Sequence, residues 1–348
     1  MSLRTITIAN RVIGGGEPCF IIAEVGANHN RRFDIARRLV DAAVEAGADA
    51  VKFQSFTVEN WLSRDFKRFP TIAGEEDPRR ALKRAELPYE MYARIAEYCR
   101  RQGIICFSTP SHVTDVDKLY ELGVPAFKFG AVQVTDLPTI THAARLGRPI
   151  ILSDGAAEMS EVLRAIETVL DTGNNQLALL HCTSLYPCQD YHLLNLNVLR
   201  SWQAVFDFPI GYSDHTLDPV IAPVAAVAMG AKIIEKHITL DRSMKGPDHP
   251  FALEPAELSC MVAAIRQTEQ ALGDTYRRIL PEEAEIARLG RRSLVATRNI
   301  KAGEVIRAED LTTKRPGTGI EPRHFNLIVG RVARRNIKAD HVLTWDMV

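Results

Sequence analysis

The amino-acid sequence predicts an α/β protein in which a parallel (β/α)8 barrel, a TIM barrel, is followed by a small, mostly β domain. Three observations support this fold class. Short β-rich apolar runs alternate with amphipathic stretches of helical period, the alternation repeats eight times, and near residue 291 the pattern changes to short strands and turns. A chain of 348 residues is long enough for one barrel with a small appendage.

Eight apolar runs are the predicted strands of the barrel. In chain order they cover residues 20–26, 50–56, 104–110, 126–132, 149–155, 177–184, 209–216 and 232–239. Helical periodicity predicts helices that include residues 34–47, 91–103, 161–173 and 219–230. Many of these stretches end in Gly, as a helix C-cap does. In such a barrel the active site lies at the C-terminal ends of the strands, so residues late in each run are the candidates for chemistry.

The last part of the chain differs from the barrel in pattern. We expect a barrel domain at residues 1–275, a charged linker at 276–290 and a small domain at 291–348, where KAG and PGTG mark turns. The KRPG turn carries Arg315. An arginine there is either simply solvated or held out by the rigid turn to cover the site of another subunit, and the sequence leaves both readings open.

Composition argues against several classes of protein. The 43 Lys and Arg residues balance 43 Asp and Glu residues, so no overall field favours binding to nucleic acid or to an anionic membrane. The opening MSLRTITIAN lacks the apolar stretch of a signal peptide, and no run of about 18 apolar residues predicts a membrane span, so we expect a cytoplasmic protein. The six cysteines form no CxxC pair, which favours reduced thiols over a disulfide frame or a zinc site.

Two histidines near the ends of consecutive predicted strands are candidate metal ligands. His215 and His237 would converge at one mouth because consecutive barrel strands are neighbours, and imidazole is a common ligand of divalent metals. A single histidine at such a place is more often a hydrogen-bonded core residue, but the matched pair favours a metal. Glu235 shares a strand face with His237 whereas Lys236 points outward, so Glu235 is the better candidate for the inner site.

Two lysines lie among apolar residues, where an unpaired ammonium group would be costly. Lys52 and Lys128 therefore need an anionic partner, which is either a barrel carboxylate such as Glu24 or Glu235, or a bound anion. Hydroxyl groups around the ring favour a pocket for a small phosphorylated carboxylate, although a serine at a strand end is by itself only a turn former. These hydroxyl residues are Ser108, Thr109, Ser153, Ser184 and Ser213, and His181 also falls late in its run.

Several segments together resemble the sialic acid synthase family, which includes N-acetylneuraminate, legionaminate and pseudaminate synthases and the spore-coat polysaccharide protein E group. The similarity runs nearly from end to end, and the motifs are highly specific as a set. They are AEVGANHN (23–30), VKFQ (51–54), FSTP (107–110), HCTSLYP (181–187), GYSDHT (211–216), EKHITLDRSMKGPDHPFALEP (235–255), RRSLVA, NIKAGEVI and TTKRPGTGI.

The resemblance implies a transferase that condenses phosphoenolpyruvate with N-acetylmannosamine or a related amino-sugar aldehyde and releases phosphate. It implies an antifreeze-like SAF domain of the β-clip type, and a domain-swapped homodimer in which the small domain of one chain covers the other's barrel mouth. Manganese or magnesium would be held by His215 and His237. Beside what the resemblance implies, Glu235 is our own candidate for orienting metal-bound water. Phosphoenolpyruvate would face Lys52, Thr109, Lys128, Ser153, Ser184 and Ser213, and the sugar would face Glu24, Gln54, Tyr186, Asp248 and Arg315 of the partner subunit; Glu24, Lys52, Lys128 and Glu235 would be the catalytic residues.

The chain departs from the family pattern in two places. In KFGAVQ (128–133), Ala131 and Gln133 replace a hydroxyl and a carboxylate that are usual in KIGSGE and KIASFE, and in SDG Asp154 replaces the Thr of STG. These changes leave the acceptor sugar open. They also leave two alternatives, namely another 3-deoxy-ulosonate synthase or aldolase that uses phosphoenolpyruvate, and a degenerate sugar-binding paralogue in polysaccharide biosynthesis. The retained His215 and His237 favour an active synthase.

Overall fold

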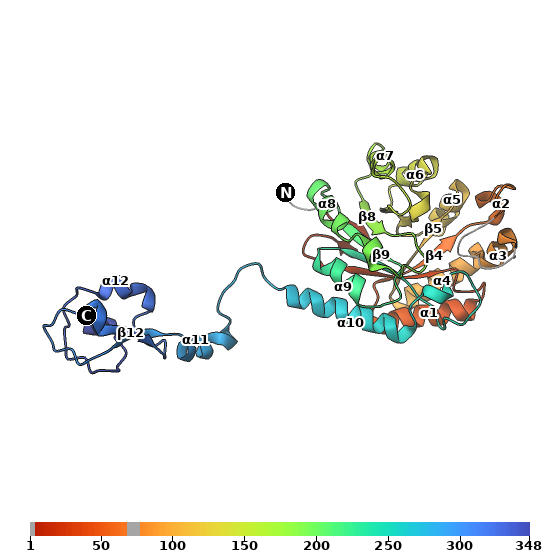
Figure 1. The fold of residues 1–348 in the computed structure, drawn as a ribbon. Coiled ribbons are helices and arrows are strands. Elements are labelled where there is room, and N and C mark those ends of the chain that lie inside the picture. Colours follow the sequence, from red (N-terminus) through yellow and green to blue (C-terminus); the bar gives the residue numbers. More distant parts are fainter. Residues whose placement is uncertain (1–3, 68–76) are drawn as a thin grey trace. The chain divides into compact units, whose positions relative to one another are not determined.

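The computed structural model describes residues 4–67 and 77–348, which form two compact units divided between Gly273 and Asp274. The larger unit is a closed barrel of eight parallel strands surrounded by helices (Figure 1). The smaller unit contains a two-stranded sheet with short helices and long connections. The predicted fold class, a (β/α)8 barrel followed by a small domain, is therefore confirmed.

The barrel strands follow one another around the ring in chain order, and β10 closes the ring on β3. They are β3 (Phe20–Gly26), β4 (Ala50–Ser55), β5 (Ile105–Pro110), β6 (Phe127–Lys128), β7 (Ile150–Ser153), β8 (Leu177–Cys182), β9 (Ile210–Asp214) and β10 (Ile233–His237). One predicted run was wrong in extent. The run at 126–132 holds only the two-residue β6, because the chain then turns into a 3-10 helix, η1 (Ala131–Gln133).

Helices cover the outside of the barrel. They are α1 (Phe33–Ala46), α4 (Tyr89–Gln102), α5 (Val113–Glu121), α6 (Leu137–Arg145), α7 (Met159–Leu170), α8 (Asn197–Val205), α9 (Ile221–Ala228) and α10 (Pro255–Leu272), with the short α2 (Val58–Trp61) and α3 (Pro78–Ala85) after β4. Gly47 and Gly103 end α1 and α4 in the left-handed conformation, at φ 79° and 76°, as C-cap glycines do. None of the described helices has the length and apolar character needed to span a bilayer.

An N-terminal hairpin closes the floor of the barrel. Strands β1 (Ile6–Ile8) and β2 (Arg11–Ile13) pair antiparallel, and Ile6, Ile8 and Ile13 are fully buried. They form one apolar cluster with side chains from the strands of the barrel. This hairpin was not predicted from the sequence, because its strands have only three residues each.

The interior of the barrel changes from apolar to polar along the strands. Side chains alternate between the two faces of a strand, so every second residue points inward. The lower layer, above the hairpin, is a cluster that includes Phe20, Ile22, Phe107, Ile151, Leu180 and Ile233. One step further along the same faces come polar side chains, including Glu24, Thr109, Ser153 and Glu235. The polar layer therefore lies at the C-terminal ends of the strands.

The smaller unit has a core of its own. Strands β11 (Ser293–Ala296) and β12 (Leu311–Lys314) pair antiparallel, and Leu294, Ile306, Ile320 and Leu343 are among its buried side chains. The unit also contains α11 (Ala284–Gly290), within the stretch predicted as a linker, and α12 (Phe325–Ile328).

Candidate functional site

A cavity of about 320 Å³ lies at the C-terminal ends of the barrel strands. This volume is at the lower end of the range for small-molecule sites. Its wall consists of strand ends and of the loops that follow them. Of the residues predicted for the site, those that line it are Glu24, Lys52, Gln54, Thr109, Lys128, Ser184, Tyr186, Ser213, His215, Glu235, His237 and Asp248.

Two lysines and two carboxylates form the deepest part of the cavity. The Lys52 ammonium Nζ lies 2.9 Å from Glu24 Oε2 and 3.7 Å from Glu235 Oε1, and it donates a hydrogen bond of 2.9 Å to Thr109 Oγ1. Lys128 Nζ lies 3.3 Å from Glu235 Oε1. All four charged side chains are almost fully buried. Both lysines thus pair with barrel carboxylates in a neutral group that opens onto the cavity.

The pKa values of this group show how strongly its charges interact. Burial would lower the pKa of Lys52, yet the Glu235 and Glu24 carboxylates outweigh it and raise that pKa. Burial would raise the pKa of Glu235, but Lys128 and Lys52 together lower it. Glu24 differs, because burial raises its pKa to about 7 and Lys52 offsets this only in part. Glu24 is therefore the carboxyl that can exchange a proton near neutral pH.

The two predicted metal-binding histidines lie side by side at the cavity wall. His215 follows β9 and His237 ends β10, and their ring centroids are 5.6 Å apart. The Tyr186 ring packs against His215 at 4.2 Å, and the Phe251 ring packs against His237 at 5.0 Å. Burial lowers the pKa of His215 to about 4, and burial together with His215 holds the pKa of His237 well below its usual value. Both imidazoles are therefore neutral at pH 7.

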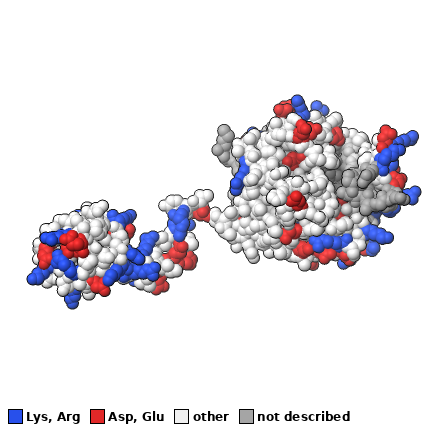
Figure 2. Space-filling view, in the orientation of Figure 1, with Lys and Arg blue, Asp and Glu red and all other residues white. Residues whose placement is uncertain are grey.

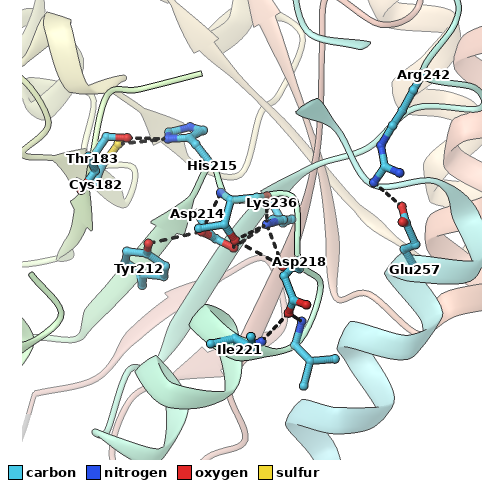
Figure 3. A network of polar contacts seen from close by, with 12 residues as sticks. Cys182, Thr183, Tyr212, Asp214, His215, Asp218, Ile221, Lys236, Arg242 and Glu257 are labelled. Atoms are coloured by element: carbon cyan, nitrogen blue, oxygen red, sulfur yellow. Dashed lines mark hydrogen bonds and ion pairs between the residues drawn. The ribbon is translucent and has the colours of Figure 1, made fainter. Parts of the chain in front are cut away.

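These residues fit a divalent cation. His215 Nδ1 lies 3.0 Å from the Thr183 carbonyl oxygen, so it carries the ring proton and leaves Nε2 unprotonated (Figure 3). Within the described residues, His237 Nδ1 and Glu235 Oε2 are buried without a hydrogen-bond partner. No group of three or more His, Cys, Asp or Glu residues in the described part of the chain is arranged to hold a metal. The chain thus offers two neutral imidazoles, and water or substrate would complete the coordination.

A glycine makes room for an acidic residue at the rim. Gly26 has φ +52°, and a Cβ there would lie 2.7 Å from Asp248 Oδ2. The same carboxylate oxygen lies 3.8 Å from His237 Nδ1, and burial raises the pKa of Asp248 to about 6. Next to it, Gln54 Nε2 donates a hydrogen bond of 3.0 Å to Glu24 Oε1. Asp248, Gln54 and Glu24 thus form one polar side of the cavity.

Gln133 spans two loops instead of extending freely into the cavity. Its Oε1 accepts a hydrogen bond of 2.7 Å from the Gly130 amide, and its Nε2 donates one of 2.8 Å to the Pro110 carbonyl oxygen. A glutamate could not donate to Pro110, so a carboxylate at this position would have to be held differently. The amide in place of a carboxylate changes both the charge and the shape of this wall.

The wall next to Ala131, the second substituted residue of the KFGAVQ segment, is closely packed. A Cβ on Gly155 would lie 2.3 Å from Ser184 Oγ and 2.7 Å from Ala131 Cβ. The loops after β6, β7 and β8 therefore meet at Gly155, which needs to be glycine for steric reasons. Ala131 is nearly buried and contributes only a methyl group to this wall.

Two expectations for strand-end residues were wrong. Ser108 faces away from the cavity, and its Oγ is hydrogen-bonded to Ser55 Oγ at 2.8 Å on the outer side of the sheet. His181 also points outward, where Nδ1 lies 2.8 Å from Asp154 Oδ2 and Nε2 lies 2.8 Å from the Leu194 carbonyl oxygen. Because strand side chains alternate, Ser108 and His181 face the other way from their neighbours Thr109 and Cys182.

Two other predicted residues do not line the cavity. Ser153 is completely buried below it, and its Oγ has no hydrogen-bond partner among the described residues. Arg315 lies in the smaller unit, in the loop after β12.

The cavity also has an apolar rim, which was not predicted from the sequence. Most of it comes from the loops after β4 and β6, with one residue from the loop after β10; its members are Phe56, Trp61, Leu82, Val132 and Pro247. Cys182 also lines the wall. Alternation within the HCTS motif could have placed Cys182 on the same side as Ser184. The rim residues carry no such periodic signal, because they lie in irregular loops and short helices.

Comparison with protein families divides the chain into two matches. The NeuB family matches residues 39–277, and the SAF domain matches residues 291–348.

Individual relatives cover nearly the whole chain. The N,N'-diacetyllegionaminic acid synthase of Legionella pneumophila is 38% identical, over 98% of this chain and 99% of that protein. The structure of the spore coat polysaccharide biosynthesis protein SpsE from Bacillus subtilis is 38% identical, covers 99% of both chains and has a TM-score of 0.69. The N-acetylneuraminic acid synthetase structure from Leptospira borgpetersenii is 33% identical, covers 82% of this chain and 95% of that one, and has a TM-score of 0.74.

Proposed function

Since the chain belongs to the NeuB family and ends in a SAF domain, we propose that it is a nonulosonic acid synthase. It condenses phosphoenolpyruvate with an amino-sugar aldehyde, N-acetylmannosamine or a relative of it, and releases phosphate. The product is a sialic-acid-like nine-carbon sugar acid. Its relatives include N,N'-diacetyllegionaminic acid synthases and an N-acetylneuraminate-9-phosphate synthase, whose names indicate products of this class. We expect the protein to work in the cytoplasm.

One observation carries the proposal. A single cavity holds two buried lysines, two buried carboxylates and two neutral imidazoles, all within the C-terminal layer of the barrel. Lysines at the deepest point suit the phosphate and carboxylate of phosphoenolpyruvate, because buried ammonium groups bind such anions strongly. The polar side formed by Glu24, Gln54 and Asp248 suits the hydroxyl groups of a sugar.

We assign His215 and His237 as the residues that hold Mn²⁺ or Mg²⁺. Bound there, the cation would supply Lewis-acid polarisation of the aldehyde oxygen. The chain holds both imidazoles in the neutral form that coordination needs, and Tyr186 and Phe251 pack against their rings.

The reaction needs one new carbon–carbon bond and one broken carbon–oxygen bond. C3 of phosphoenolpyruvate bonds to the aldehyde carbon, and the aldehyde oxygen takes up a proton. Water then adds at C2 and loses a proton, and the bond between C2 and the phosphate oxygen breaks to release phosphate. Lys52 and Lys128 stabilise the negative charge on the phosphate as it leaves, and holding both substrates in one cavity lowers the entropic cost.

The two carboxylates act on the attacking water in different ways. Glu235, whose pKa is lowered, stays ionised and orients the water that attacks C2. Glu24, whose pKa is about 7, is suited to take up the proton that this water loses. Both carboxylates are held by Lys52, so a change at Lys52 would affect both roles.

We further propose a domain-swapped homodimer in which the small domain of one chain covers the barrel mouth of the other and brings Arg315 to the sugar. An area of the barrel surface around α9 is free of charged side chains in Figure 2. Exposed apolar residues of the loops after β8 and β9 and the start of α9 include Leu185, Tyr191, Leu193, Leu217 and Ile221. Several large apolar side chains exposed on neighbouring loops favour an interface there.

The first experiment is an assay of phosphate release from phosphoenolpyruvate with Mn²⁺ present. The acceptors would be N-acetylmannosamine, its 6-phosphate and the diacetamido hexoses of the legionaminate and pseudaminate pathways, and mass spectrometry would identify the product. We expect turnover with one of them. A folded, metal-loaded dimer that releases no phosphate with any acceptor would contradict the proposal and favour a sugar-binding paralogue.

Matched variants connect the activity to this cavity. His215→Ala and His237→Ala should abolish Mn²⁺-stimulated turnover. Ser213→Ala should lower the activity because Ser213 lines the cavity, whereas Ser108→Ala should leave it within about twofold, since Ser108 is an equally buried strand hydroxyl on the opposite face. Equal effects of the two serine changes would argue against this assignment.

A further inference from the structure

A buried ion pair lies directly behind the two histidines. Lys236 on β10 is the register partner of Asp214 on β9, and Lys236 Nζ lies 2.5 Å from Asp214 Oδ2. Lys236 and Asp214 are each only 1% exposed. Neither lines the cavity, so neither can contact a substrate there. Each is the sequence neighbour of one histidine, Asp214 of His215 and Lys236 of His237.

The Lys236 ammonium group binds several oxygen atoms of the loop that carries His215 (Figure 3). Besides Asp214, Lys236 Nζ donates to the carbonyl oxygen of Thr216, to Thr216 Oγ1 at 3.2 Å and to the carbonyl oxygen of Asp218 at 3.3 Å. These acceptors all come from residues 214–218, the segment that leaves β9. The chain therefore wraps around one charge from a neighbouring strand.

The Asp214 carboxylate also accepts hydrogen bonds from the same segment. Its Oδ1 accepts hydrogen bonds from the Thr216 amide at 3.0 Å and from the Tyr212 hydroxyl at 3.2 Å, and its Oδ2 accepts one from Thr216 Oγ1 at 2.9 Å. At the end of the segment, Asp218 Oδ1 accepts from the amides of Val220 and Ile221 at 2.8 and 2.7 Å, where α9 begins. The path of the backbone through His215 is fixed on both sides.

Stability alone is a weak reason for such a pair. Replacing a buried ion pair by apolar side chains is often neutral or stabilising, because the charges lose their hydration. A network of this kind is instead suited to holding backbone atoms in one arrangement. In metal sites, groups that orient the ligands without touching the metal commonly change metal affinity by 10- to 100-fold when they are mutated.

We propose that Lys236 and Asp214 form a positioning pair that fixes His215 relative to His237 and thereby sets the affinity of the chain for its divalent cation. The inference rests on the proposed function in one respect, the assignment of the two histidines as metal ligands. It adds that the geometry of this metal site depends on a salt bridge on the opposite face of the barrel wall.

The test measures metal binding without any substrate. Calorimetric titration with Mn²⁺ of the full chain, and of Lys236→Met and Asp214→Asn, gives the dissociation constants, and urea unfolding gives the stabilities. We expect both variants to bind Mn²⁺ at least about tenfold more weakly while still folded. Hydrogen exchange of the apo protein should show faster exchange of the amides at 215–218 in both variants.

A second ion pair of the barrel unit serves as the control. Arg266 Nη2 on α10 lies 2.8 Å from Asp49 Oδ2, and neither residue lines the cavity. Arg266→Met should lower the stability and leave the Mn²⁺ dissociation constant within about twofold of the wild-type value. This separates an effect on ligand position from a general loss of stability.

The double variant Asp214→Asn with Lys236→Met keeps the inference falsifiable if a single variant fails to fold. It buries no uncompensated charge, so we expect it to recover stability but still to bind Mn²⁺ weakly. Wild-type affinity in this folded double variant would overturn the positioning role, as would a wild-type chain that binds no divalent cation. Metal binding without turnover on any acceptor would instead count against the proposed function and leave the positioning role standing.

Discussion

At the residue scale, the chemistry of the cavity depends on whether a strand side chain points into the barrel or out of it. Along β10, Glu235 and His237 line the cavity while Lys236 between them lies in the network behind it. Residues on one face of the strand line the cavity, and residues on the other face hold the strand and its loops in place. The pleat separates the direct contacts of the two sets, so a residue on the outer face can affect the cavity only through the backbone that the two sets share.

Gln133 is the residue at which we expect specificity to change. In Gln133→Glu, one carboxylate oxygen would face the Pro110 carbonyl oxygen, so the side chain should leave the bridge and turn toward the cavity. We expect the ranking of acceptor sugars, measured as kcat/KM, to shift by about tenfold, with the KM for phosphoenolpyruvate within about twofold.

Gln133→Met is the matched control, since it removes the bridge without adding charge. If both variants keep the wild-type ranking of acceptors, Gln133 does not determine specificity. If both change it equally, the bridge and not the charge is responsible.

The His181–Asp154 pair predicts a pH dependence of stability. Both ring nitrogens of His181 face oxygen acceptors, so the imidazolium is the favoured form, and although burial opposes it, Asp154 raises the pKa of His181 above its usual value. Stabilisation by a raised pKa is complete below the unfolded value of about 6.5 and is lost as the pH rises through the folded value. We expect the free energy of unfolding in urea to fall from pH 6 to pH 8 by on the order of 1 kcal/mol more in the wild type than in Asp154→Asn.

The exposed pair of His142 and Asp117 provides the comparison. Its atoms are 2.6 Å apart but both side chains are largely solvated. Asp117→Asn should therefore leave the pH dependence nearly unchanged. Identical pH profiles for the wild type and Asp154→Asn would show that His181 stays neutral in the folded protein.

At the element scale, the strands and loops contribute differently to the site. The strands supply the buried lysines and carboxylates and His237, whereas His215 and the apolar rim come from the loops after them, with Phe56 and Trp61 after β4 and Val132 after β6. Insertions and replacements are tolerated in loops more readily than in strands. Differences in acceptor among relatives are therefore expected to reside in the rim.

The β1–β2 hairpin should contribute stability and not catalysis. Ile8 is fully buried in the lower layer of the barrel, so Ile8→Ala should lower the free energy of unfolding by about 2–5 kcal/mol, as measured in urea, with kcat within about twofold. Val12 in β2 is 39% exposed, and Val12→Ala should cost less than about 1 kcal/mol. A large loss of kcat in folded Ile8→Ala would mean that the lower layer shapes the cavity.

The sequence predicted the elements with strong periodic signals and missed those without them. Each apolar run contains a barrel strand, but the hairpin strands are too short to show alternation, and the 3-10 helix that shortens β6 lies inside an apolar run that reads as a strand. For the site, strand-end positions indicated Lys52 and His237 correctly as cavity residues. The direction of Ser108 and the partner of Lys236 depend on parity and register, which one sequence does not specify.

At the scale of the whole molecule, the question is which chain completes each site. If Arg315 acts in the barrel of the partner subunit, a heterodimer of His215→Ala and Arg315→Ala chains has one site with both defects and one site with neither. If Arg315 acts in its own chain, each site carries one defect.

Co-expression of the two variants with different tags tests this directly. We expect each homodimer to be inactive or nearly so and the purified heterodimer to recover about half of the wild-type activity, since one of two sites is intact. Absence of recovery in a heterodimer that is stable on size exclusion would rule out the swapped arrangement.

The hairpin under the barrel also affects how substrates enter the cavity and products leave it. With the lower end filled by Ile6, Ile8 and Ile13, the cavity has the mouth as its route of entry and exit. If phosphoenolpyruvate binds at Lys52 and Lys128 as proposed, it occupies the deep end and the sugar binds above it. Phosphoenolpyruvate would then have to bind first, and phosphate could leave only after the sugar product. Phosphate would then be a competitive inhibitor with respect to phosphoenolpyruvate in product-inhibition measurements. The substrate that binds first would thus be the source of the product that leaves last.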